Sequence, residues 1–176
     1  MNYNLIGDSI SQDLDTSTKQ WCNEITNINN FAIPGANTYD FLPSQYKSAN
    51  RDNVELRHII PELNNLQTID NQLMTADNST HFLLFFNMND CRMRLFCNNW
   101  NDYKIEETYE NLKMYNYFAP NKITYITPIP ASRVEYLYNV QLCHYIKSFF
   151  PCINVFDNLA DEDYKLNSFF DIGDGM

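Results

Sequence analysis

Five short apolar runs lie along the chain, and longer stretches with a helical repeat separate them. Such alternation is typical of a parallel β-sheet that helices cover on both faces. The run 82–86 reads Phe-Leu-Leu-Phe-Phe without polar alternation, which predicts a central strand buried on both faces. The expected strands are residues 3–6, 28–33, 82–86, 123–127 and 153–156.

Helical periods fill the stretches between these strands. Apolar residues recur at steps of three and four over 134–149, and Ser132 with Glu135 forms a capping-box pattern at the start of that stretch. The other expected helices cover residues 61–73, with Pro61 in the first turn, residues 105–119, and a segment that includes Trp21 and Ile25. We therefore expect a single α/β domain over residues 1–176.

Composition narrows the classes of partner. The chain has 176 residues, of which 44% are hydrophobic, and this is enough for one core. Its formal net charge of -10 disfavours nucleic acids and anionic membranes, because like charges repel. The N-terminal residues lack the basic and apolar regions of a signal peptide, and no apolar run approaches membrane-spanning length. The sequence predicts a soluble, cytoplasmic protein.

The cysteines have neither the number nor the spacing of a disulfide framework or a zinc site, because they are odd in number and lack a Cys-x-x-Cys pair. Reduced thiols are therefore expected at Cys22, Cys91, Cys97, Cys143 and Cys152. The sequence calls for neither a metal nor an organic cofactor.

Polar motifs follow the first three expected strands, and two of them contain one of the chain's four glycines. Gly7-Asp8-Ser9 comes directly after the first strand, so Ser9 falls on a strand-to-helix turn at the carboxyl edge of the sheet. Gly35 follows the second strand, and Asn89 follows the third within residues 87–90. The hydroxyl of Ser9, at this edge, can face a substrate.

These three motifs resemble the sequence blocks of the SGNH hydrolases, also called GDSL esterases and lipases. Residues 7–11, with Ser9, look like the first block of that family. Residues 30–38 look like the second block, and residues 87–90 look like the third, with Asn89. The resemblance covers essentially the whole chain. It implies a three-layer, flavodoxin-like SGNH hydrolase fold with a five-stranded parallel sheet in the order 2-1-3-4-5.

The resemblance also implies roles for individual residues. In the family, a serine attacks an ester carbonyl after a histidine takes its proton, and an aspartate three residues before that histidine orients the ring. Ser9 is similar to the nucleophile, and Asp174 is similar to the aspartate. The implied oxyanion hole consists of the backbone N–H groups of Ser9 and Gly35 and the side-chain amide of Asn89.

The histidine of this pattern would directly follow residues 174–176, where the sequence ends. Three explanations stay open: a sequence cut short before the histidine and its terminal helix, which we favour, a member that has lost catalysis, and a base from elsewhere. The histidines present are His58, His81 and His144, and His81 lies at the strand end opposite to Ser9. We expect the 176-residue chain to be nearly inactive, because Ser9 lacks a base.

The predicted function is serine-dependent hydrolysis of a carboxylic ester. A small acyl group, such as acetyl, on a sugar or another polar alcohol is favoured, because nothing in the sequence points to a membrane substrate. Arg92 and Trp100 follow the third strand and are candidates for binding such a substrate, with an ordinary surface excursion as the alternative. A catalytically inactive binding module, acetyl transfer and thioester hydrolysis remain alternative functions.

Two residues beside the predicted site have structural interpretations. Asp8 is expected to hold the turn through hydrogen bonds to nearby backbone N–H groups. Asn87 stands where glycine is usual in the family that the chain resembles, and asparagine tolerates the left-handed backbone of a tight turn.

Overall fold

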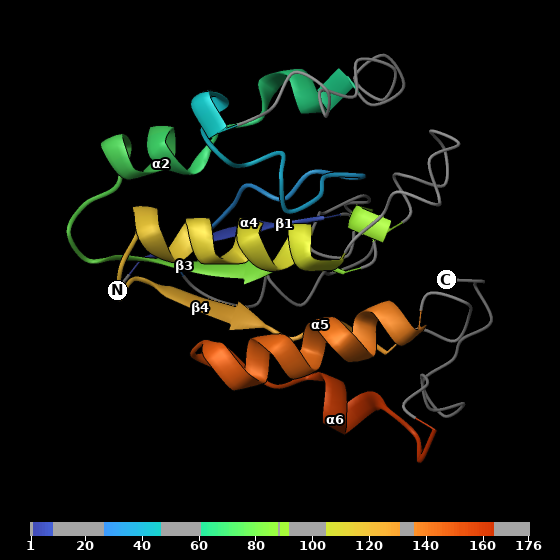
Figure 1. Ribbon diagram of the computed structural model, residues 1–176. Helices are drawn as coiled ribbons and strands as arrows, with labels where there is room; N and C mark the ends of the chain where they lie inside the picture. Colours follow the sequence, from blue (N-terminus) through green and yellow to red (C-terminus); the bar gives the residue numbers. More distant parts are fainter. Residues whose placement is uncertain are drawn as a thin grey trace, which may run out of the picture.

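The computed structural model describes residues 2–8, 27–46, 61–87, 89–91, 105–130 and 136–163. A five-stranded sheet lies at its centre, in the order β2-β1-β3-β4-β5, and every neighbouring pair of strands is parallel. Helices flank this sheet (Figure 1). The α/β class, the parallel sheet and the strand order 2-1-3-4-5 predicted from the sequence are confirmed.

The apolar run in the middle of the chain forms the central strand. The strands are β1 (Asn2–Gly7), β2 (Ile28–Asn30), β3 (Thr80–Phe85), β4 (Ile123–Ile126) and β5 (Cys152–Ile153). β3 lies between β1 and β4, and its register pairs Leu83 with Leu5 and Leu84 with Ile6. All four of these leucine and isoleucine side chains are buried, as a strand covered on both faces requires.

The last strand is shorter than the sequence predicts. In place of a strand over 153–156, β5 ends at Ile153, and the short helix α6 (Phe156–Leu159) follows. The backbone N–H groups of Val155 and Phe156 donate to the Thr127 hydroxyl, at 2.9 and 3.0 Å, instead of to a neighbouring strand. A side chain from the end of β4 therefore stops the ladder and starts the helix.

Three helices are packed against one face of the sheet. They are α2 (Ile69–Thr75), α4 (Ile105–Phe118) and α5 (Tyr136–Phe149), and α4 and α5 run side by side (Figure 1). The helices predicted over 105–119 and 134–149 are confirmed, whereas Ser132, Glu135, Trp21 and Ile25 lie outside the described residues. No helix in the described part of the chain is long and apolar enough to cross a membrane.

The single helix expected over 61–73 is instead two elements. A 3-10 helix, η4 (Pro61–Asn65), precedes α2, and the backbone is extended at Thr68 between them. The N–H of Ile69 donates to the carbonyl of Phe41 at 2.7 Å, which fixes the start of α2 against the loop after β2. The apolar period continues through 61–73, but this long-range contact sets where the second helix begins. A second 3-10 helix, η2, spans Ser44–Tyr46.

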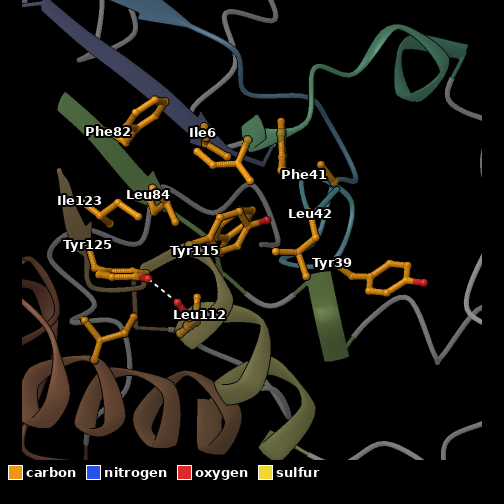
Figure 2. Packing of buried hydrophobic residues seen from close by; sticks show 14 of the residues in the cluster. Ile6, Tyr39, Phe41, Leu42, Phe82, Leu84, Leu112, Tyr115, Ile123 and Tyr125 are labelled. Atoms are coloured by element: carbon orange, nitrogen blue, oxygen red, sulfur yellow. Dashed lines mark hydrogen bonds between the residues drawn. The ribbon is translucent and has the colours of Figure 1, made fainter. Parts of the chain in front are cut away.

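The main core lies between the sheet and these helices. Figure 2 shows Tyr115 of α4 between Leu84 of β3 and Phe41 of the loop after β2. Tyr125 of β4 is also buried, and its hydroxyl donates to the Leu112 carbonyl at 2.6 Å. Buried tyrosine hydroxyls need such partners, so the core joins α4 to β4 by a hydrogen bond as well as by packing.

The other face of the sheet has a smaller apolar cluster. Leu5, Leu83, Phe85 and Ile126 are between 0 and 7% exposed there. Ile129, just after β4, packs against the same cluster. Burial on both faces explains why the run 82–86 has no polar alternation.

Candidate functional site

The carboxyl ends of β1 to β4 lie at one edge of the sheet, because the strands are parallel. At this edge the structure places Gly35 in the loop after β2, and Asn89 in a helical segment, residues 89–91, after β3. The other predicted site residues, Ser9, Arg92, Trp100 and Asp174, lie outside the described residues. Asp8, which directly precedes Ser9, is described and is buried at the end of β1.

The loop after β2 stays beside β1 and then turns at Gly35. β2 ends at Asn30, so the strand expected over 28–33 is too long, but the Ile33 N–H still donates to the Gly7 carbonyl at 3.1 Å. Gly35 has φ 71, in the left-handed region, and the Ala36 N–H closes the turn on the Ile33 carbonyl at 3.1 Å. Glycine adopts this backbone without the cost that a Cβ imposes.

The side chain of Asn89 reaches this turn. Its Nδ2 donates to the carbonyl oxygen of Ala36 at 3.0 Å, so the amide of Asn89 lies beside the residue that follows Gly35. An asparagine amide nitrogen has two hydrogens, and this bond uses one of them. The segments after β2 and β3 therefore bring together two of the sequence-predicted residues.

A buried polar cluster, which sequence reasoning missed, fastens the same two loops. The Asp90 carboxylate accepts hydrogen bonds from the Thr38 backbone N–H at 3.0 Å and from the Thr38 hydroxyl. Thr108 of α4 donates to it as well, at 3.3 Å. Asn111 donates to the Thr38 hydroxyl at 2.9 Å, and the Tyr115 hydroxyl donates to the Thr38 carbonyl. The only sequence signal was that Asp90 directly follows Asn89.

Burial raises the pKa of Asp90 to about 6, because the loss of hydration outweighs the hydrogen bonds from Thr38 that favour the charged form. The nearby negative charge of Asp40 adds to this increase. In the unfolded chain the ordinary value is 3.8, so between pH 4 and 6, approximately, the folded state binds more protons. Stability from this group therefore falls as the pH rises through that window.

Asp90→Asn should remove this pH dependence. The ionised carboxylate costs the folded parent on the order of 2 to 3 kcal/mol above pH 6 relative to pH 4. We expect the plot of unfolding free energy against pH to be flatter between pH 4 and 6 in the variant, as measured by urea unfolding at several pH values. Asp161→Asn, an exposed substitution, is the control and should leave the slope as in the parent. Equal slopes in Asp90→Asn and the parent would contradict the raised pKa.

A second series of buried hydrogen bonds connects the segments that follow β1, β3 and β4. The Asp8 carboxylate accepts the backbone N–H of Asn87 at 2.9 Å and its side-chain Nδ2 at 3.4 Å. Oδ1 of Asn87 accepts the Ile129 N–H at 2.8 Å, and Asn139 of α5 donates to the Ile129 carbonyl at 2.7 Å. Asp8 thus accepts a backbone N–H as the sequence suggested, but the donor is Asn87 after β3 and not a residue of its own turn.

Asn87 itself does not use the left-handed backbone that the sequence suggested. Among the described residues other than glycine, only Asn27 and Asn121 have positive φ. Asn87 instead contributes side-chain hydrogen bonds to Asp8 and Ile129, and its backbone φ is not positive.

Neither histidine in the described part of the chain lies at the carboxyl edge. His81 is the second residue of β3, at the amino end, with Nε2 2.9 Å from the Thr124 hydroxyl oxygen. His144 lies in the second half of α5, which returns from the end of β4 toward the start of β5. His58 lies outside the described residues. A histidine base for this edge has to come from outside the described ranges.

Solved structures share this fold. One, described as a "putative acylhydrolase" from Bacteroides fragilis NCTC 9343, is 16% identical with a TM-score of 0.57, covering 99% of this chain and 77% of that chain. Another, described as a "putative platelet activating factor" from Streptococcus pneumoniae, is 18% identical with a TM-score of 0.50, covering 94% of this chain and 71% of that chain. No protein-family model matches the chain, and no curated protein matches its sequence.

Proposed function

We propose that the chain is built for serine-dependent hydrolysis of carboxylic esters at the carboxyl edge of the sheet. The observation that carries the proposal is the bond from the Asn89 amide to the Ala36 carbonyl, which gathers the Asn89 and Gly35 loops at the edge where β1 leads into Ser9. The description of one structural neighbour as an acylhydrolase agrees with this reaction class.

In the proposed reaction, the Ser9 oxygen attacks the ester carbonyl and its proton passes to a base. The carbonyl oxygen becomes negative and accepts hydrogen bonds from the N–H groups of Ser9 and Gly35 and from the amide of Asn89. Collapse of this intermediate expels the alcohol, which takes the proton from the base, and leaves an acyl group on Ser9. Water, deprotonated by the same base, then releases the acid. Asp174 would orient the base.

The substrate we favour has a small acyl group, such as acetyl, on a sugar or another polar alcohol. Arg92 and Trp100 are the side chains assigned to bind it, because they follow β3 in the chain and supply a cation and a flat apolar face. Transfer of an acetyl group to an acceptor alcohol would use the same acyl-serine intermediate with the acceptor in place of water.

Covalent labelling of Ser9 tests the reaction class on the chain as it stands. A fluorophosphonate probe should label the 176-residue chain poorly, since no described histidine faces the site, and added imidazole should speed labelling by supplying a base. Mass spectrometry of peptides should place the label on Ser9. Ser9→Ala should abolish it, whereas Ser79→Ala, at an exposed turn near the amino end of β3, should not.

A chain that binds acetylated sugars but whose Ser9 is never labelled, with or without imidazole, would contradict the esterase proposal. That result would favour a binding module that uses the same loops without catalysis.

A further inference from the structure

Asn87 occupies a position where the family that the chain resembles usually has glycine, and both its side-chain nitrogen and its side-chain oxygen make hydrogen bonds. The residue is 1% exposed. Its Nδ2 donates to Asp8 at 3.4 Å, and its Oδ1 accepts the Ile129 N–H at 2.8 Å. Glycine can make neither bond, so this chain has a cross-link between the loops after β1 and β4 that a glycine would lack.

The side-chain oxygen of Asn87 accepts the only backbone N–H that residues 128–130 possess. Residues 128–130 read Pro-Ile-Pro, and proline has no N–H, so Ile129 supplies the single backbone donor of this segment. That N–H is bound by Asn87. Replacing Asn87 with a residue that has no acceptor leaves the Ile129 N–H, in a partly buried loop, without this partner.

The carbonyl group of Ile129 is held as well. The Ile129 carbonyl accepts the Asn139 side chain of α5 at 2.7 Å, and Asn139 is 0% exposed. The Ile129 side chain packs against the cluster that contains Leu83 and Phe85 of β3. Since Ile129 is held on both sides, a bond from Asn87 to it has a rigid anchor.

We propose that Asn87 is a positioning residue of the candidate active site. Its backbone N–H and its side-chain amide both bind Asp8 at the end of β1, its side-chain oxygen holds Ile129 after β4, and Asn89 follows it two residues further along the chain. One buried residue thereby connects the ends of β1, β3 and β4, and the proposed nucleophile and oxyanion donor directly follow two of these strands in the chain. This inference rests on the proposed esterase function and adds a residue to it.

The hydrogen-bond link can be tested without any enzymatic activity. In Asn87→Gly, we expect hydrogen exchange of the Ile129 amide, followed by NMR, to accelerate by about tenfold or more, because its acceptor is lost. Asn121→Gly is the matched control: Asn121 is exposed with φ 61, which suits glycine, so exchange at Ile129 should be unchanged. Unchanged exchange in Asn87→Gly would overturn the link.

The positioning role has its own readout, fluorophosphonate modification of Ser9 in imidazole buffer. Asn87→Gly should lower the maximal rate of modification by about tenfold or more and leave the half-saturating reagent concentration unchanged, as misplacement of reacting groups predicts. Asn121→Gly should match the parent. Faster exchange at Ile129 with an unaltered modification rate would overturn the role of Asn87. Absence of labelling in the parent would instead overturn the esterase proposal, while the exchange data still decide the link.

Discussion

A variant with a histidine directly after Met176, followed by a helix-forming segment, is expected to hydrolyse p-nitrophenyl acetate on the order of ten-thousandfold faster than the 176-residue chain. The added histidine would supply a base, and a serine hydroxyl is a weak nucleophile at neutral pH until its proton can be taken up. With the histidine three residues after Asp174, a short turn can set the carboxylate against the imidazole Nδ1–H. The neutral Nε2 is then free to accept the proton of Ser9.

Three substitutions in the extended variant separate catalysis by Ser9 from unspecific hydrolysis by an added imidazole. Ser9→Ala should return the rate to the background. Asp174→Asn should lower kcat by up to about ten-thousandfold while the protein stays folded, since the tautomer of the histidine is no longer fixed. An alanine in place of the added histidine should restore the low rate of the original chain. An extended chain that folds but hydrolyses none of a panel of acyl and glycan esters would contradict the enzyme proposal.

The sheet was predictable from the sequence because its signal is local. The run 82–86 is apolar on both faces, and this pattern alone predicted that the strand it forms, β3, lies at the centre of the sheet. The strand order, in contrast, came from the resemblance of the blocks around Ser9, Gly35 and Asn89, since periodicity says nothing about which strands are neighbours. The structure confirms the order, and the carboxyl edge where the Gly35 and Asn89 loops meet follows from it.

The errors of the sequence reading arose where distant groups decide local structure. The break between η4 and α2 is fixed by the bond from the Ile69 N–H to Phe41, far away in the sequence. The early end of β5 depends on the Thr127 hydroxyl at the end of β4. A pattern of apolar residues cannot indicate either contact, because both are hydrogen bonds between polar groups that are distant along the chain.

The polar clusters beneath the candidate site were beyond the sequence for a related reason. Thr38 comes from the loop after β2, Asp90 from the helical segment after β3 and Asn111 from α4, and nothing in their spacing along the chain links them. Asn87 had a visible signal, the departure from glycine, but only the structure shows what its side chain contacts. Sequence blocks can thus suggest which groups react, while the residues that hold them in place appear only in three dimensions.

Asn89→Ala in the extended variant should lower kcat for ester hydrolysis by about a hundredfold to a thousandfold with little change in KM. The amide hydrogen not bound to the Ala36 carbonyl is the one proposed to meet the oxyanion, and this charge exists only in the transition state and the intermediate. Loss of that donor therefore raises the barrier without weakening ester binding. Steady-state kinetics with p-nitrophenyl acetate would measure the split between kcat and KM.

The same substitution also removes the bond to Ala36, so its structural effect has to be separated from its chemical one. Asn158→Ala is a matched control: the amide of Asn158, an exposed residue of α6, likewise donates to a backbone carbonyl, that of Asn154, at 3.3 Å. Each variant should lose no more than about 1 to 2 kcal/mol of unfolding free energy in urea, but only Asn89→Ala should lose kcat. If kcat stays within about twofold of the parent while turnover still requires Ser9, Asn89 is not an oxyanion donor, because removal of a donor that stabilises the transition state costs far more than that.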